Sequence, residues 1–344
     1  MTRSASSEAV SLLPRAAYVR DLRGELPDGV FARATSRLAF VPVHLAVIVM
    51  STIAIAASWL PWFTVPLLSL AIGASFAGLT FIAHEGLHGA IVRGRRAQYV
   101  LGFLGFLPFL VSPTLWNAWH NSDHHARANL HDDPDAYPTI ERYQAEAGAR
   151  FAVDAFSLGG GRWRGGLSLI LGFTVQSAAQ LIGSLDSGIL TRAQHRRAMV
   201  ESGIAVAFWL TVAVLVGFVP FLFVYVVPLL VANLCVMAFI LTNHSLSPRV
   251  SVNDPLASGL TVTTSRLVTW LTLGFGFHVE HHLFPSMSGR HARAVCALLQ
   301  ARWPDRYHSM PLSGALLRLH RSGRVYKSDT RLFDPRSGSE HATL

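Results

Sequence analysis

Two pairs of long apolar segments constrain this chain more than any other feature of its sequence. In the first pair, residues 38–60 and 62–83 are separated only by a short proline-containing turn. In the second pair, residues 204–218 lead through a similar turn into residues 221–242. A helix of about 20 mainly apolar residues crosses the hydrocarbon core of a bilayer. We therefore expect two transmembrane helical hairpins.

Two further apolar segments are less regular. Residues 99–115 are interrupted by glycines and by Pro108, so that a span and a re-entrant or interfacial helix are both compatible with the pattern. Residues 167–185 carry Gln176 and Gln180 within an apolar run, which favours an amphipathic helix at the surface.

The composition also points to the membrane. Hydrophobic residues make up 51% of the 344 residues and charged residues only 14%, against about 25% charged residues in soluble domains. An ordinary soluble enzyme and a disordered chain are therefore excluded. The net charge of +9 comes almost entirely from arginines beside the apolar segments, which indicates contact with an anionic leaflet rather than with nucleic acid. Two cysteines, Cys235 and Cys296, are too few for a disulfide framework or a four-cysteine iron–sulfur site.

The arginines also predict an orientation. The turns at Pro61 and Pro220 hold no Lys or Arg, and the positive-inside rule therefore makes both termini and the long connections cytoplasmic. The arginines at the opposite ends are Arg33, Arg37, Arg93, Arg95, Arg96, Arg192, Arg196, Arg197 and Arg249. We expect an all-α, multi-pass integral membrane protein with four transmembrane helices in two hairpins and a cytoplasmic helical cap. Residues 1–37 would be a cytoplasmic N-terminal segment, 38–330 the membrane domain and 331–344 a polar C-terminal tail.

Half of the 16 histidines fall into three short motifs. The motifs are His84-Glu-Gly-Leu-His88, His120-Asn-Ser-Asp-His124-His125 and His278-Val-Glu-His281-His282. Residues three and four positions apart share one face of a helix, so each motif can direct two or three imidazoles to one point. A further candidate, His244, follows Asn243 where the last apolar segment ends.

Clustered imidazoles indicate metal binding. Imidazole binds iron, zinc, copper and nickel well, and eight ligands exceed the four or fewer that one zinc ion takes from a protein. The motifs therefore favour two metal ions, and the residues alone leave iron and copper both open. Isolated histidines are better interpreted as interfacial residues; these are His44, His195, His308, His320 and His341. Three polar clusters beside lipid would be costly without a ligand.

Two other interpretations explain less of the sequence. His84-Glu85-Gly86-Leu87-His88 satisfies the H-E-x-x-H pattern of zinc proteases, but that chemistry would leave the other two motifs without a use. A metal transporter would place its histidines near the bilayer midplane, whereas these motifs follow the ends of the apolar segments.

The three motifs, their order and their separations resemble those of the membrane fatty acid desaturase superfamily, over residues 38–330. The segment His278-Val-Glu-His-His-Leu-Phe-Pro285 and the following Trp303-Pro-Asp-Arg-Tyr307 are similar to acyl-chain desaturases in particular. The chain has no His-Pro-Gly-Gly haem motif, so no fused cytochrome b5 domain is expected. Related hydroxylases and ketolases of carotenoids, sterols or sphingolipids share the motifs, and desaturation and hydroxylation both stay open.

This resemblance implies two non-haem iron ions, dioxygen as a co-substrate and an acyl lipid as the substrate. Reduction of dioxygen to two waters takes four electrons, of which the substrate supplies two. The other two would come from an external ferredoxin or cytochrome-type donor that docks on the arginine-rich cytoplasmic face.

The resemblance also assigns roles to residues. The implied iron ligands are His84, His88, His120, His124, His125, His244, His278, His281 and His282. Asn243 would hold a water beside them. Glu85, Asp123 and Glu280 would accept ring N–H groups of the ligands or pair with arginines. Asp132, Asp133 and Asp135 around Pro134 are typical of a turn. Trp116 and Trp119 would anchor the chain at the interface or line an acyl tunnel.

Overall fold

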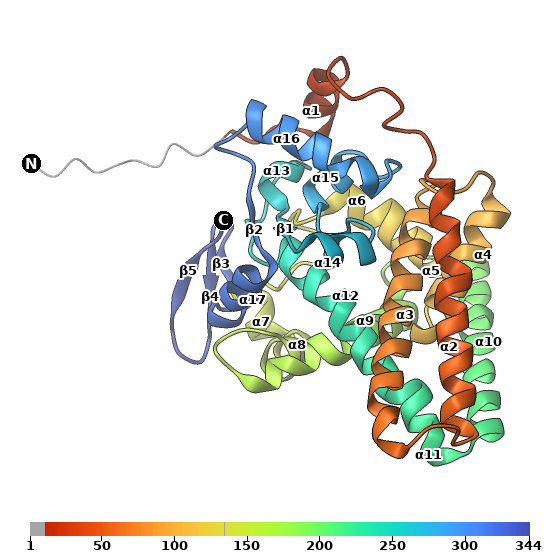
Figure 1. The fold of residues 1–344 in the computed structure, drawn as a ribbon. Coiled ribbons are helices and arrows are strands. Elements are labelled where there is room, and N and C mark those ends of the chain that lie inside the picture. The colour runs from red at the N-terminus through yellow and green to blue at the C-terminus, as the bar shows by residue number, and fades with distance from the viewer. Residues whose placement is uncertain (1–10, 134) are drawn as a thin grey trace, which may run out of the picture.

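The computed structural model describes residues 11–133 and 135–344; the first ten residues of the expected N-terminal segment, and Pro134, lie outside the described part. Long helices form a bundle at one end of the molecule, and short helices and strands form a cap at the other (Figure 1). Helix α1 and the C-terminus lie in the cap, and the turn before α11 lies at the opposite end of the bundle (Figure 1).

Within residues 11–133 and 135–344, five helical segments are long and apolar enough to cross a membrane. They are η1–α2 (Thr35–Ala39 and Phe40–Ala56), η2–α3 (Trp62–Thr64 and Val65–Leu87), η5–α9 (Trp163–Gly165 and Gly166–Gly183), α10 (Arg192–Val216) and α11–η6–α12 (Phe218–Phe221, Leu222–Val226 and Val227–His244). Four of them correspond to the expected spans. The fifth, α9, is the helix expected at the surface; it qualifies because its strongly polar side chains are only two glutamines, which face the protein.

The irregular apolar segment is a broken helix. Helices α4 and η3 (Arg95–Phe106 and Leu107–Phe109) meet α5, η4 and α6 (Pro113–Trp116, Asn117–His124 and His125–Arg127) at an angle of 108°. Pro108 and Pro113 lie at the break, where each lacks a backbone N–H for helical hydrogen bonding. This pair can count as a sixth span only if its two arms are taken together.

The cap contains short strands as well as helices. Its helices are α1 (Arg15–Leu22), α7 (Ile140–Ala145), α8 (Ala147–Phe156), α13 (Pro255–Ser258), α14 (Arg266–Leu271), α15 (His278–Leu283), η7 (Gly289–His291), α16 (Ala292–Arg302) and α17 (Leu312–Arg321). Strands β1 (Thr261–Thr263) and β2 (Ser309–Pro311) pair in parallel. Strands β3 (Val325–Ser328), β4 (Arg331–Phe333) and β5 (Glu340–Ala342) form an antiparallel sheet.

The expectation of an all-α fold therefore needs correction: the fold is mostly helical, and the described part of the chain also contains five short strands. Residues 331–344, expected as a polar tail, contribute β4 and β5 to the antiparallel sheet. Leu332 is fully buried between exposed Arg331 and half-buried Phe333, and Tyr326 opposite it is also buried. Strands of three or four residues are too short for alternation of apolar and polar residues to show clearly in the sequence.

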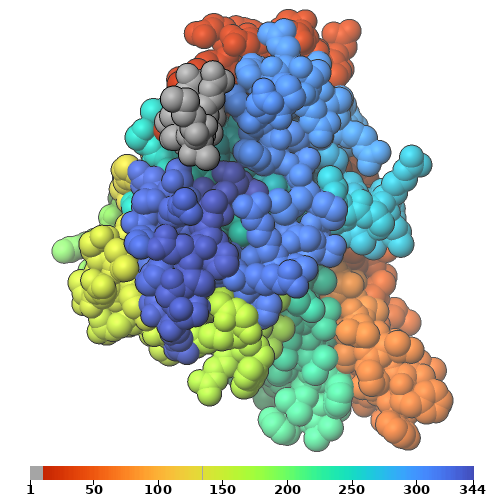
Figure 2. Space-filling model, turned by 90° about the vertical axis from the view of Figure 1, so that its left-hand side faces the viewer, coloured from red at the N-terminus to blue at the C-terminus, as the bar shows by residue number. Residues whose placement is uncertain are grey.

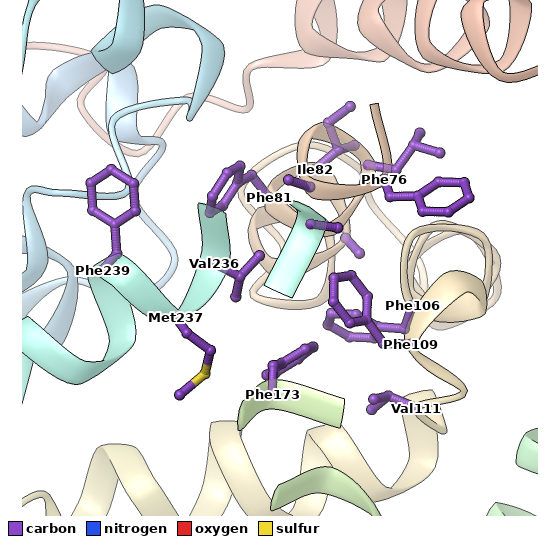
Figure 3. Packing of buried hydrophobic residues seen from close by; sticks show 14 of the residues in the cluster. Phe76, Phe81, Ile82, Phe106, Phe109, Val111, Phe173, Val236, Met237 and Phe239 are labelled. Carbon is purple, nitrogen blue, oxygen red and sulfur yellow. The ribbon is translucent and has the colours of Figure 1, made fainter. Parts of the chain in front are cut away.

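The core of the bundle forms around α3, which packs against α2, α4 and α12. Aromatic and aliphatic side chains from these helices and from α9 interlock there (Figure 3); they include Phe76, Phe81, Ile82, Phe106, Phe173, Val236, Met237 and Phe239. Helices α3 and α4 come very close, because a Cβ atom at Gly105 would lie only 2.3 Å from the carbonyl oxygen of Leu79. The C-terminal ends of α3 and α12 reach the cap together and bring His84 and His244 with them.

Candidate metal centre

The eight histidines of the motifs and His244 converge on one buried region between the bundle and the cap. They come from the end of α3, from η4 and α6, from the end of α12 and from α15. Neighbouring rings in this cluster lie with centroids between 4.4 Å (His278 and His282) and 6.4 Å (His120 and His281). Segments that are up to about 200 positions apart in the chain are thus joined at one site.

The first group consists of His84, His88, His120 and His281, which each offer one ring nitrogen within 4.8 Å of the others. Nε2 of His84 lies 3.2 Å from Nε2 of His120. Nε2 of His88 is buried and has no hydrogen-bond partner among the described residues. A buried imidazole nitrogen without a partner is costly, and a metal ion would satisfy it.

The second group consists of His124, His244, His278 and His282, again with one nitrogen each within 4.8 Å of the others. Nε2 of His244 lies 2.5 Å from Nε2 of His278 and 3.1 Å from Nε2 of His282. The other ring nitrogen of His244 lies 2.8 Å from the carbonyl oxygen of Ser258. A proton on Nδ1 therefore leaves the lone pair of Nε2 directed at its neighbours, as in many metal sites.

His125 lies between the two groups. Its Nε2 atom lies 3.1 Å from Nε2 of His281, and its ring is 4.8 Å from the ring of His88 and 4.4 Å from that of His282. His125 belongs to neither group of four. Its Nε2 atom, which could bind a metal ion, faces the first group.

Local backbone structure explains how two of the motifs present their rings. The second motif lies in η4, a π-helical segment, where the wider turn changes the spacing at which side chains share a face. The third motif fills α15, a six-residue helix that begins at His278. In α15 the positions of His281 and His282 relative to His278 are the three- and four-residue spacings that place side chains on one face.

Burial keeps the third motif in the neutral form. The pKa values of His278, His281 and His282 lie well below the usual range, first because burial disfavours the charged ring and then because neighbouring histidines would repel it. Neutral imidazole is the form that binds a metal. Two groups of four neutral nitrogen donors, with an unpartnered nitrogen on His88, fit two metal ions.

The three carboxylates beside the motifs bond elsewhere among the described residues. Glu85 pairs with the guanidinium of Arg37 and accepts from the backbone N–H of Gly289 at 2.7 Å, which ties α3 to the cap. Asp123 pairs with Arg127, four residues further along.

Glu280 is fully buried and accepts hydrogen bonds from the hydroxyl groups of Thr261 and Tyr307. Burial raises the pKa of Glu280, and these two hydroxyl groups oppose that shift. The bonds join α15 to β1 and to the segment before β2, so Glu280 fixes the helix that carries the third motif.

A carboxylate that the sequence indicated only as part of a turn faces the second group. Oδ2 of Asp135 lies 3.6 Å from Nδ1 of His124. Asp135 also accepts hydrogen bonds from Nε1 of Trp119 at 2.7 Å, and from Gln176 and Gln180 of α9 at 3.0 Å and 3.2 Å. Burial, and then the nearby charge of Asp133, raise the pKa of Asp135 to about 7. Gln176 and Gln180 lie four positions apart, and so on one face of an otherwise apolar helix. This pattern in the sequence could have indicated that they bond to a buried polar residue such as Asp135.

Asn243 is fully buried beside His244. Neither atom of its side-chain amide has a hydrogen-bond partner among the described residues, and the residue lines the cavity described next. An unpartnered buried amide is costly unless water or a ligand completes its bonds.

A cavity of about 580 Å³ begins at both histidine groups and continues between apolar helices. That volume lies within the range of about 300–1,000 Å³ that is typical of small-molecule sites. Trp116 and Trp119 are buried and line the cavity, and the ring of Trp116 stacks on that of His120 at 4.4 Å. Further along, Phe173 of α9 and Met237 of α12 form its apolar walls.

Comparison with known proteins identifies the class of protein. The family model described as "Fatty acid desaturase" matches residues 57–313, and the chain therefore belongs to this family. It is similar to an sn-1 oleoyl-lipid 12-desaturase of Arthrospira platensis, with 22% identity over 278 residues that cover 76% of each chain. It is also similar to a chloroplastic omega-6 fatty acid desaturase of Spinacia oleracea, with 21% identity over 318 residues, 88% of this chain and 67% of the relative.

Proposed function

We propose that this protein is an oxygen-dependent desaturase that introduces a double bond into a fatty acyl chain. The observation that carries the proposal is the cavity that starts at both histidine groups and continues between the apolar walls of α9 and α12. An acyl chain in such a cavity would pass its methylene groups directly beside two metal ions. The names of the similar proteins support desaturation over hydroxylation or ketolation.

The metal ions that fit this family and this donor set are two irons. The nine ligands would be His84, His88, His120, His124, His125, His244, His278, His281 and His282. When bound, the irons supply the activation of dioxygen that breaks an unactivated C–H bond, which side-chain acids and bases do not do at neutral pH. Asn243, with its unpartnered amide, would hold a water at the position that the imidazoles leave open.

The residues of the chain orient these groups and exclude water. The carbonyl of Ser258 fixes the ring of His244, and the carboxylate of Asp135 faces His124. Trp116 covers His120 on the cavity side. In the overall reaction, the acyl chain loses two electrons and two protons, an external ferredoxin or cytochrome-type donor gives two electrons, and dioxygen becomes two waters with two further protons from the solvent.

Metal content and product analysis test this proposal. The chain, expressed in a host that lacks the activity, should purify with about two irons per chain, as expected from two sets of four donors. Acyl chains of the host should lose two mass units per new double bond, measured by gas chromatography and mass spectrometry. Products that instead gain one oxygen atom would identify a hydroxylase, and an unchanged lipid profile with no bound iron would contradict both.

A further inference from the structure

A second, smaller cavity also reaches the first histidine group. Its volume is about 30 Å³, which is room for about two water-sized molecules, since one water needs about 10–15 Å³. His84 and His281 of the first group line it, whereas the four histidines of the second group do not. The cavity is far too small for an acyl chain, but it can admit a small molecule to the first group.

Two aromatic rings lie between this small cavity and the large one. Phe81 and Phe275 line both cavities, and their ring centroids lie 4.9 Å apart. The ring of Phe275 also packs edge-on against that of His84, at 5.0 Å. The large cavity continues between α9 and α12, whereas the small one continues into the cap, where Met287 and Ala292 line it. The two cavities therefore approach the first group from different directions.

The outer end of the small cavity lies between the end of α14 and η7. Phe277 and Gly289 line this cavity but not the large one, and both are partly exposed. A Cβ atom at position 289 would lie only 2.2 Å from the carbonyl oxygen of Leu273. Glycine at this position therefore lets η7 approach the end of α14 closely beside the opening.

Helix α14 places this opening near the apolar helices. Trp270 of α14 is 58% exposed, and its ring lies 5.1 Å from that of Phe40, the first residue of α2. In Figure 2 the cyan surface around α14 lies between the blue surface of the cap and the orange surface of the first two spanning helices. The small cavity therefore opens close to the level at which α2 leaves the cap for the bilayer.

The lining of the small cavity is mainly apolar. Leu273 and Met287 are buried in its wall beside the two phenylalanines. Among its described side chains, only Glu85 has a buried polar atom, Oε2, without a hydrogen-bond partner; Oε1 of Glu85 is bonded to Arg37 and to the N–H of Gly289. A water on Oε2 would fill about half of the volume, and the remaining space faces apolar groups.

We infer that dioxygen reaches the first histidine group through this small cavity, by a route separate from that of the acyl chain. This inference rests on the proposed desaturase function and specifies where its co-substrate enters. Dioxygen is apolar and concentrates in hydrocarbon relative to water, which suits an apolar cavity that opens near the bilayer. An acyl chain that fills the large cavity then leaves the entry of dioxygen open, so dioxygen can arrive after the acyl chain is bound.

Xenon tests the small cavity without any turnover, because xenon enters apolar cavities of proteins. Crystals of the full chain with its metal, pressurised with xenon, show bound xenon by anomalous scattering. We expect a xenon site between Phe81, Phe275 and Ala292. Ala292→Leu should remove this site, since Ala292 is buried in the cavity wall. The matched control is Ala315→Leu, the same change at a fully buried position of α17 that lines neither cavity, and it should keep the site.

The dependence of the rate on dioxygen tests the route. Turnover is measured on an oleoyl lipid in detergent micelles with an electron donor, at varied dioxygen. Ala292→Leu should raise the KM for dioxygen by about tenfold, the lower end of the effect of one methylene group too many in an apolar pocket. The KM for the oleoyl lipid should stay unchanged in this variant, and Ala315→Leu should change neither KM. Iron content should match that of the unmodified protein in both variants, because neither alanine belongs to the histidine groups.

Three results would overturn the inference: a small cavity that holds water but no xenon in the unmodified protein, the same KM for dioxygen in both variants, or an equal rise of both KM values in Ala292→Leu. Overpacking a core costs about 1–3 kcal/mol, and if Ala292→Leu does not fold, Ala292→Val gives the same tests with a smaller insertion. A lack of dioxygen-dependent product from the unmodified protein would contradict the desaturase function itself, whereas the xenon site does not depend on that function.

Discussion

Nδ1 of His244 lies 2.8 Å from the carbonyl oxygen of Ser258. This contact determines which nitrogen of His244 faces the second histidine group, because a backbone carbonyl can only accept. The remaining nitrogen, Nε2, is the one that lies nearest to His278 and His282. Metal-ligating histidines usually donate their other ring N–H to such an acceptor, so this orientation fits the proposed ninth ligand.

The first prediction concerns His244. His244→Ala should lower activity by more than about 100-fold, the upper end of the loss for a change just outside a metal's own ligands, and should reduce bound iron. The matched control is His341→Ala in β5, which should keep both iron and activity because His341 lies in the C-terminal sheet. Near-normal turnover and iron content in His244→Ala would make His244 a structural residue.

The second prediction concerns the motifs. Substitution of Ala for any of the eight motif histidines should abolish activity and lower iron content, because seven of the rings belong to the two groups of four donors and His125 faces the first group with its Nε2 atom, 3.1 Å from Nε2 of His281. The sharpest tests are His120→Ala and His281→Ala, since these rings reach the first group from η4 and α15, on opposite sides. Full activity in either variant would contradict a two-metal centre.

The third prediction concerns Asp135, which faces His124 and accepts three hydrogen bonds. Asp135→Ala should reduce iron affinity by about 10- to 100-fold, the usual effect of removing an outer carboxylate. It should also lower stability by about 1–3 kcal/mol, because buried donors lose their acceptor.

Asp135→Asn separates these two effects, since an amide oxygen still accepts from Gln176 and Gln180 but carries no charge. We expect near-normal thermal unfolding in Asp135→Asn together with a changed absorption spectrum of the cobalt-substituted protein. An unaltered spectrum and unaltered iron affinity in both variants would show that Asp135 acts only in packing.

The fourth prediction compares two ion pairs. Arg37 and Glu85 are nearly buried, with 12% and 11% of their side chains exposed, so Arg37→Ala should destabilise the protein by about 3–5 kcal/mol by leaving a buried charge. In the pair of Arg127 and Asp123, Arg127 is 35% exposed, and Arg127→Ala should cost only about 1 kcal/mol. Thermal unfolding in one detergent compares the two variants, and equal losses would contradict the assigned role of Glu85 in joining α3 to the cap.

The sequence predicted those features that depend on a local pattern of residues, and it did not predict those that depend on contacts between segments far apart in the chain. Long apolar runs and histidines at helical spacings are local patterns, and they indicated the helices and the residues that the fold gathers at the centre. Asp135 was not recognised as a partner of His124, because that contact depends on α9 packing against the turn and on Gln176 and Gln180 facing inward. The strands after residue 324 were missed for the same reason: their stability comes from pairing and from the burial of Tyr326 and Leu332, not from a local pattern.

The last prediction concerns the number of times that the chain crosses the membrane. Helix α9 is long and apolar enough to cross a membrane, but both of its ends contact elements near the cap. Before α9, the backbone N–H of Gly161 donates to the carbonyl oxygen of His320 at 2.8 Å. After α9, the hydroxyl oxygen of Ser184 lies 2.8 Å from Nδ1 of His195, near the start of α10. Helix α10 then runs to the end of the bundle that is farthest from the cap (Figure 1). We therefore expect α9 to lie along the membrane surface and the chain to cross four times.

Reporter fusions decide this. Reporters inserted after Gly161 and after Ser187 should report the same side of the membrane, and that side should be the cytoplasm, together with reporters after Arg96 and at the C-terminus. Reporters in the turns at Pro61 and Gly217 should report the other side. If α9 crossed the membrane, the reporters after Gly161 and Ser187 would lie on opposite sides, and α10 and α12 would then deliver His244 to the wrong face. Because His244 must meet histidines from α3 and α15 in one cluster, a single face of the membrane for all of these fusions is the arrangement that the two histidine groups require.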